Sequence, residues 1–152
     1  MSPRSNGATN WQAPTFNSRT GLFYVSAADS YSMYYLTDED DHPEGYAGFD
    51  AEVWAKPLLL AIDYNTGKRV WSHEFPNRGA SPPALLSTAG NLLFSGDQSN
   101  NFIAFDPMDG KILWHYRMSS GATNGPMTYE TSGTQFVVVA DLDTLTAFAL
   151  KH

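Results

Sequence analysis

The densest cluster of ionisable side chains is the run TDEDDHPEG at residues 37–45, in which residues 38–41 are four consecutive acids. Carboxylate oxygens are the ligands that Ca²⁺ prefers, so this run has the chemistry to bind that ion. A calcium loop of the EF-hand type alternates its ligands and has glycine at the sixth position, and the run does neither. We therefore expect a solvated acidic loop at 38–41, with a metal site as the alternative.

The four histidines form no group suited to metal binding or catalysis. His73 and His115 follow a tryptophan by two residues and by one residue, so the alternation of side chains along a strand places them on opposite faces. We expect both at surface strand positions. The sequence has no cysteine, no phosphate-binding glycine loop and no nucleophile paired with a base. We therefore assign no catalytic residue and no metal ligand.

One phrase is written twice in the chain. LLLAIDYNTGKRVW at residues 58–71 returns 43 residues later as NFIAFDPMDGKILW at 101–114, and TLTAFALKH at 144–152 begins it again. A period in the low forties fits one β-propeller blade, although helical repeats share it. The segments are short, rich in β-branched and aromatic residues and joined by glycine turns, which favours strands. Trp71 and Trp114, one in each full copy, are expected to pack between neighbouring sheets.

The repeat predicts an all-β fold, a partial β-propeller of about three four-stranded antiparallel blades. We expect the blades at about 11–76, with an insertion at 30–57, at about 82–118 and, incomplete, at about 125–150. The third unit lacks the strand that carries the tryptophan. Three sheets do not close a ring, and open sheet edges pair readily with other strands. We therefore expect the edges to meet further blades or to drive self-association.

The composition narrows the range of partners. The chain has 152 residues, of which 42% are hydrophobic, and a formal net charge of −7. This length and apolar content suit a domain with a core, while the negative charge argues against nucleic acid and anionic membranes as partners. No apolar stretch reaches the length of a membrane-spanning helix, and the first residues lack the apolar core of a signal peptide.

In these motifs the sequence resembles the quinoprotein dehydrogenases, eight-bladed β-propellers that bind pyrroloquinoline quinone (PQQ). The pattern D-x-x-[TD]-G-K-x-[VL]-W is similar to their tryptophan-docking repeat. TNWQAPTFNSRTGLFYVSA at residues 9–27 resembles the Asn-Trp segment of the PQQ-dependent alcohol dehydrogenases, and residues 85–130 resemble their C-terminal blades. The resemblance implies the C-terminal part of a PQQ-dependent dehydrogenase of alcohols or sugars, with its blades belonging to an eight-bladed ring.

The resemblance also implies that Asn10 and Trp11 contact PQQ on the cofactor face of the ring. An asparagine amide can donate to a quinone or carboxylate oxygen. Read without the resemblance, Asn10 caps a turn and Trp11 is a packing residue. The sequence departs from the family at Pro82, where many alcohol-oxidising members have a tryptophan near the cofactor, so we expect another substrate or a weaker cofactor site. The loop after QFVVVAD is also shorter than in many of these members.

In the parent enzyme the resemblance implies PQQ with Ca²⁺, a small alcohol or sugar as substrate and a periplasmic location. The calcium ligands and the catalytic Asp of the family lie in upstream blades, so we expect this chain to contribute blades and part of the PQQ pocket and to be inactive alone. The missing N-terminal blades are its expected partner, because one of their strands completes the last blade.

The alternative is a non-catalytic β-propeller scaffold for contacts between proteins. Pro82 and the aromatic residues of the insertion favour it. These aromatic residues are Tyr31, Tyr34, Tyr35, Tyr46, Phe49 and Trp54. We expect them to cover the rim of the propeller or to meet a partner.

Overall fold

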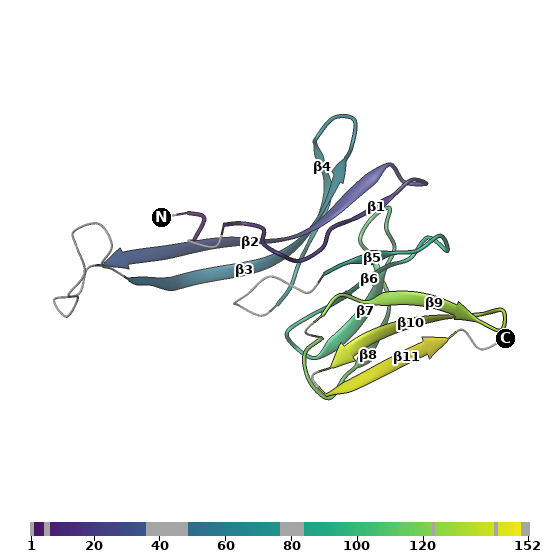
Figure 1. Cartoon of the computed structure of the whole chain (residues 1–152). Coiled ribbons are helices and arrows are strands. Elements are labelled where there is room, and N and C mark those ends of the chain that lie inside the picture. The colour runs from purple at the N-terminus through teal and green to yellow at the C-terminus, as the bar shows by residue number, and fades with distance from the viewer. Residues whose placement is uncertain are drawn as a thin grey trace.

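The computed structural model describes residues 2–4, 7–35, 49–76, 84–122, 124–141 and 143–149. Within these ranges the chain forms strands and no helix, so no described helix could cross a membrane. The strands make three antiparallel sheets of four, four and three strands (Figure 1). The predicted all-β architecture of three antiparallel units is confirmed.

Within each sheet, every strand pairs with its successor in the sequence, as in a propeller blade. The first sheet contains β1 (Thr15–Asn17), β2 (Leu22–Tyr35), β3 (Phe49–Asp63) and β4 (Arg69–Glu74). The second contains β5 (Leu86–Ser87), β6 (Leu93–Gly96), β7 (Asn101–Phe105) and β8 (Ile112–Arg117). The third contains β9 (Met127–Thr131), β10 (Thr134–Asp141) and β11 (Thr144–Ala149).

The repeated phrase forms the same turn in the first two sheets. Asp63 and Asp106 each accept a backbone N–H from a residue two positions later, at 3.0 Å and 2.8 Å. The N–H groups of Gly67 and Gly110 donate back to the carbonyls of these aspartates, at 2.8 Å and 2.9 Å. Both glycines have positive φ, +67° and +74°, which explains why glycine recurs there. The aspartate and the glycine together set the turn before the tryptophan strand.

Trp71 docks the first sheet onto the turn of the second. Its indole N–H donates to the carbonyl of Pro107 at 3.0 Å, and the buried Tyr24 hydroxyl donates to the same carbonyl at 2.9 Å. The Trp71 ring lies against Gly110, where an added Cβ would stand 2.7 Å from the indole Cε3. On the second sheet, Trp114 packs edge-on against Phe148 of β11, with ring centroids 5.2 Å apart. The predicted packing of both tryptophans between sheets is confirmed.

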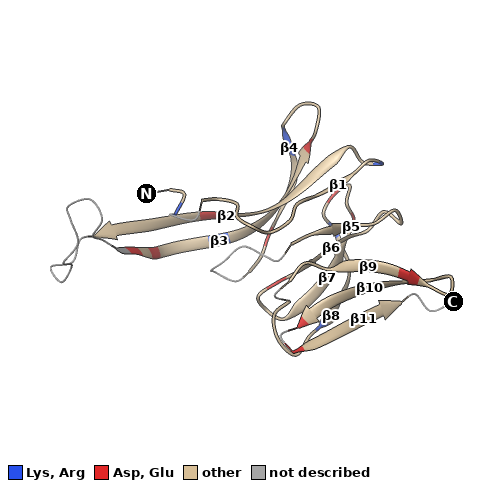
Figure 2. Cartoon of the chain, viewed as in Figure 1, with Lys and Arg blue, Asp and Glu red and all other residues tan. Residues whose placement is uncertain are grey.

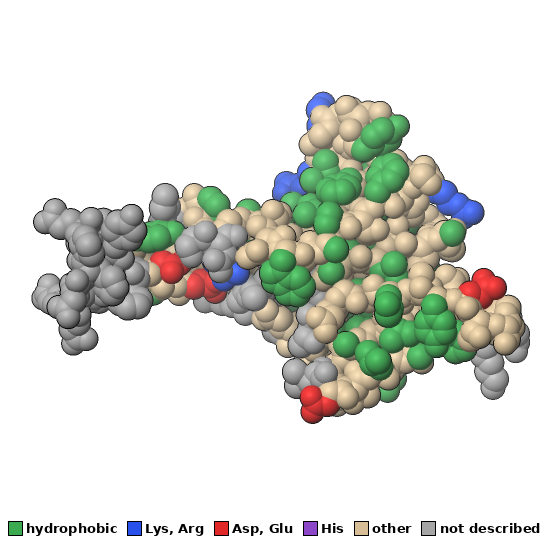
Figure 3. Space-filling model, in the orientation of Figure 1, with side chains coloured by type: hydrophobic (Ala, Val, Ile, Leu, Met, Phe, Trp, Pro, Cys, Tyr) green, Lys and Arg blue, Asp and Glu red, His purple; other side chains and the backbone are tan. Residues whose placement is uncertain are grey.

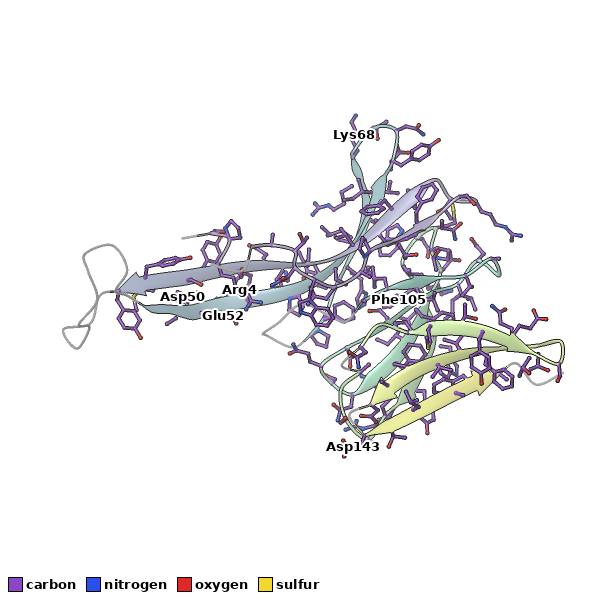
Figure 4. All side chains as sticks on the ribbon, in the orientation of Figure 1. Arg4, Asp50, Glu52, Lys68, Phe105 and Asp143 are labelled. Atoms are coloured by element: carbon purple, nitrogen blue, oxygen red, sulfur yellow. The ribbon has the colours of Figure 1, made fainter. Side chains whose placement is uncertain are left out.

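Two hydrophobic cores fill the spaces between consecutive sheets. The core between the first and second sheets contains Leu22, Tyr24, Leu59, Ala61, Phe75, Leu85, Leu93, Ile103 and Phe105. The core between the second and third contains Phe94, Phe102, Ala104, Met118, Ala122 and Val139. Phe105 lies among the side chains between the sheets in Figure 4. Each sheet therefore buries its apolar side chains against a neighbouring sheet. Burial of one such side chain contributes about 1.5–3 kcal/mol to the stability of the fold.

His73 lies between the sheets, so the prediction of a surface position is wrong for this histidine. Its ring centroid is 4.8 Å from that of Phe75 and 5.0 Å from that of Phe105, both edge-on. The reason is register: two residues after Trp71, the His73 side chain points to the same, docked face of β4. His115, one residue after its tryptophan, is exposed as predicted.

The predicted insertion lengthens the two middle strands of the first sheet. β2 and β3 run on as a hairpin arm, residues 28–35 and 49–57, that projects from the sheets (Figure 1). Its register shifts once, between Tyr31 and Ser32. Arg4 and Glu52 form an ion pair that ties the N-terminal segment to the arm (Figure 4). The acidic run 38–41, and Tyr46 with it, lies outside the described residues.

The docking contact predicts unequal effects of alanine at two equivalent glycines. Gly110→Ala adds a Cβ 2.7 Å from the Trp71 Cε3, which is too close, and it does so at a residue with a positive φ. We therefore expect the free energy of unfolding to fall by about 2–4 kcal/mol. Gly67→Ala is the matched control, because its φ is +67° and nothing lies within 4 Å of the added Cβ. We expect a loss of about 1 kcal/mol there. Urea unfolding measures both variants, and equal losses would contradict the docking contact.

The position of His73 predicts a pH dependence of stability. Burial between the sheets lowers the pKa of His73 below its ordinary 6.5, while Asp97 and Glu74 act in the opposite direction. A lowered folded-state pKa means that the stability is fully present above pH 6.5 and decreases as the pH falls through that pKa. Urea unfolding between about pH 7.5 and about pH 5 should show this loss. His73→Phe should reduce the change of the unfolding free energy with pH, whereas His115→Phe should leave it unchanged. The same pH dependence in both variants and in the unsubstituted chain would refute the role of His73.

Candidate functional site

The connections at one end of the sheets form a common surface. In an antiparallel blade, the start of the first strand, the turn between the second and third strands and the end of the fourth lie at the same end. We call this end the loop face. It comprises residues 7–14, 84–85, 97–100, 118–122 with 124–126, and 141 with 143. The Asp-Gly turns of the repeat lie at the opposite end.

Asn10 and Trp11 lie on the loop face, immediately before β1. The Asn10 side-chain oxygen accepts the backbone N–H of its neighbour Trp11 at 2.9 Å, so the Asn10 side chain folds back onto its own segment. Trp11 is 66% exposed and is not a packing residue in this structure. The side-chain oxygen of Gln12 is buried and has no hydrogen-bond partner among the described residues. The segment therefore presents an exposed indole face, while the acceptor of Gln12 stays buried.

Backbone hydrogen bonds hold this segment on both sides. The Ala28 N–H of β2 donates to the carbonyl of Ala8 at 2.7 Å. The Leu85 N–H, just before β5, donates to the carbonyl of Ala13 at 3.1 Å. The turn with Asn10 and Trp11 is thus fixed between the first sheet and the beginning of the second.

Asp97 is buried at the loop-face end of β6, with 6% of its surface exposed. Its two carboxylate oxygens accept the backbone N–H and the side-chain amide of Asn101, both at 2.8 Å. The Asp97 N–H donates in turn to the Asn101 carbonyl at 2.9 Å. These bonds close the turn between β6 and β7. Both oxygens of the Asp97 carboxylate are therefore used within this turn.

Asp141 is a loop-face residue that the sequence analysis missed. Its Oδ2 accepts the Ser119 N–H at 2.9 Å, the Ser119 hydroxyl at 2.7 Å and the Ser120 N–H at 3.0 Å, and its Oδ1 accepts the Ser120 hydroxyl. The bond from the Ser119 hydroxyl is the main cause that lowers the Asp141 pKa below 3.8, and the two backbone N–H bonds add to it. A strand ending in Asp and a Ser-Ser pair 21 residues earlier gave no signal that they meet.

The described residues of the loop face include the side-chain amide of Asn10 and the exposed indole of Trp11, and they show no metal site. No three or more His, Cys, Asp or Glu side chains of the described part of the chain lie together so that they could hold an ion. Figure 2 shows the few Lys and Arg residues scattered over the sheets. Pro82 lies outside the described residues.

The sequence matches one family model and several quinoprotein alcohol dehydrogenases. The family model described as outer membrane protein assembly factor BamB, a PQQ-repeat model, matches residues 55–152. The quinoprotein alcohol dehydrogenase PedE of Pseudomonas putida is 33% identical over 146 residues. That match covers 91% of this chain and 23% of PedE, so the chain spans less than a quarter of this relative.

Solved structures agree with the sequence matches. The quinohemoprotein alcohol dehydrogenase ADHIIG of Pseudomonas putida HK5 superposes with a TM-score of 0.79 at 24% identity, over 92% of this chain and 23% of that one. The quinohemoprotein alcohol dehydrogenase of Comamonas testosteroni superposes with a TM-score of 0.72 at 28% identity, over 90% of this chain and 22% of that one. The chain therefore belongs to the PQQ-repeat β-propeller family and is homologous to the quinoprotein alcohol dehydrogenases, as its motifs predicted.

Proposed function

We propose that this chain is part of a PQQ-dependent dehydrogenase that oxidises alcohols or sugars, to which it contributes propeller blades and part of the PQQ pocket. The observation that supports the proposal best is the match to a quinoprotein alcohol dehydrogenase over 91% of the chain. The loop-face position of Asn10 and Trp11 adds to it, because both residues come from the segment that resembles this family.

Asn10 and Trp11 have the chemistry to contact PQQ. The bound cofactor supplies the quinone that accepts two electrons from the substrate. The hydrogen bond from the Trp11 N–H uses the Asn10 side-chain oxygen, which leaves the amide NH₂ to donate to a quinone or carboxylate oxygen. The indole of Trp11, 66% exposed, offers a flat surface to a planar ring system. Asn10 therefore orients the cofactor and Trp11 covers one of its faces.

The calcium ion of the proposed parent enzyme is not accounted for by the described residues. They contain no group of acidic or histidine side chains fit to coordinate a metal. We place the calcium ligands and the catalytic base in other parts of a longer protein, and we expect no dehydrogenase turnover from these residues alone. The match to 23% of PedE supports this division.

The third sheet is the proposed contact with the rest of that protein. β11 pairs with β10 on one side, and no other described strand pairs with β11. The outward face of this sheet exposes Met127, Tyr129 and Leu145, and hydrophobic side chains gather over it in Figure 3. Upstream blades that complete the sheet and cover this face are the proposed partner, and the periplasm is the proposed location. In their absence the same edge would favour self-association.

The second candidate function is a non-catalytic propeller scaffold. The observation that favours it is the hairpin arm, on which Tyr31, Tyr34 and Tyr35 are exposed. An exposed aromatic ribbon is typical of a protein contact surface. Activity of a reconstituted enzyme separates the two functions.

A chimeric enzyme tests the catalytic proposal. This chain replaces the homologous segment of PedE, and PQQ content and alcohol-dependent dye reduction are measured. We expect PQQ to bind and Trp11→Ala to reduce PQQ affinity at least about fivefold, since an aromatic contact of this kind is worth about 1 kcal/mol beyond its buried area. Met108→Ala, in the turn at the opposite end of the sheets, is the control and should leave affinity unchanged. A folded chimera without PQQ would favour the scaffold.

The open edge of β11 predicts self-association of the chain. We expect light scattering to give a mass that rises with concentration above the 16.7 kDa of one chain. Leu145→Lys places a charge on the exposed outward face of β11 and should lower the association. Lys56→Ala, on the distant arm, is the comparison variant. A monomer of the unsubstituted chain at millimolar concentration would contradict this prediction.

A further inference from the structure

The described residues of the connection between β8 and β9, 118–122 and 124–126, lie on the loop face between the second sheet and the third. The Met118 N–H donates to the carbonyl of Asn100 at 2.7 Å, which ties the beginning of the connection to the turn between β6 and β7. Met118 and Ala122 are buried in the second core. Near its end, an added Cβ at Gly125 would stand 2.7 Å from the Cβ of Ala84. The connection is therefore packed closely on the second sheet.

The Asp141 carboxylate links this connection to the third sheet. Asp141 is 4% exposed, and it accepts both the backbone N–H and the hydroxyl of Ser119 and of Ser120. Hydrogen bonds to a carboxylate are stronger than those between neutral groups, and two of the four donors are backbone groups whose direction fixes the chain path. One side chain thus fixes two consecutive residues of the connection that follows the second sheet.

A comparison with Asp97 shows that this role differs from turn capping. Asp97 follows the last residue of β6, and Asp141 ends β10, so both occur where the second strand of a sheet reaches the loop face. Asp97 binds Asn101 within its own turn. Asp141 stands in a shorter turn, paired with Thr144, and its carboxylate reaches across to the preceding sheet. The same residue type at a matching place therefore joins two sheets in one case and closes a hairpin in the other.

The connection also borders the segment that carries Asn10 and Trp11. Leu85 is bonded to Ala13, three residues after Asn10, and the neighbouring Ala84 contacts Gly125 of the connection. The loop face is consequently continuous from the segment before β1, through the beginning of the second sheet, to Asp141.

We propose that Asp141 is a positioning residue whose carboxylate holds the β8–β9 connection in one conformation and so shapes the loop face between the second and third sheets. Its consequence for cofactor binding rests on the proposed function, since the connection adjoins the segment to which we assign PQQ. The positioning itself does not depend on any ligand.

Amide hydrogen exchange and NMR chemical shifts of the whole chain test the positioning. In Asp141→Asn we expect the exchange of the Ser119 and Ser120 amide protons to speed up at least about tenfold, because a charged acceptor is replaced by a neutral one. Their amide proton signals should also move upfield, while the β10 and β11 amides keep their exchange rates. Asp143→Asn is the matched control: it removes the same charge from an exposed residue of the same turn (Figure 4) and should change neither.

The double variant Ser119→Ala with Ser120→Ala keeps the carboxylate and removes the two hydroxyl donors. It should give a smaller, equally local increase in exchange, and it decides the question if Asp141→Asn does not fold. Unchanged exchange at Ser119 and Ser120 in every folded variant would overturn the inference.

A separate titration with PQQ and Ca²⁺, followed by tryptophan fluorescence, tests the consequence in PedE chimeras that carry the same substitutions. Weaker binding by Asp141→Asn than by Asp143→Asn supports a link between the connection and the cofactor. Equal binding by both overturns that link. Absence of PQQ binding by the unsubstituted chimera counts against the proposed function, and the exchange result then still decides the positioning role.

Discussion

The contact between the Trp71 indole and the turn that precedes β8 is the constraint on which the arrangement of the sheets depends. The indole N–H is satisfied by a carbonyl of the next sheet, and the ring fills the space that a side chain at Gly110 would take. A glycine is needed there for two reasons: its φ is positive, and it allows the approach of the indole. The tryptophan and the glycine of the repeat therefore form one interaction, in which the tryptophan of the first copy contacts the glycine of the second copy.

This pairing explains why the fold was readable in the sequence. Asp63, Gly67 and Trp71 recur at fixed spacing because a turn and a docking residue must be reproduced in each blade, and the period then predicts the sheets. The position of His73 was misjudged because alternation along a strand separates two faces without saying which face is docked. The sequence predicted the insertion at 30–57 but not that it forms a hairpin arm, since an insertion into a repeat has no second copy to compare with.

The site was predicted less completely, for a physical reason. Asn10 and Trp11 were found because they lie together in a segment that resembles a family, and the structure adds that the Asn10 side chain folds back onto this segment while Trp11 stays exposed. Asp141 ends a strand of the third sheet, and its serines lie more than twenty residues earlier, in the connection that follows the second sheet. Their contact depends on the length of one turn and on how two sheets pack, and neither is encoded in a local pattern.

The tryptophan docking also determines how the molecule comes apart. Because Trp71 binds the next sheet and not its own, the stability of each blade is shared with its neighbour, as in linear repeat proteins with nearest-neighbour coupling. The second sheet has a docked partner on both sides, whereas the first and third have one each. We therefore expect these residues, when separated from further blades, to unfold from the outer sheets first, with the middle sheet retained longest.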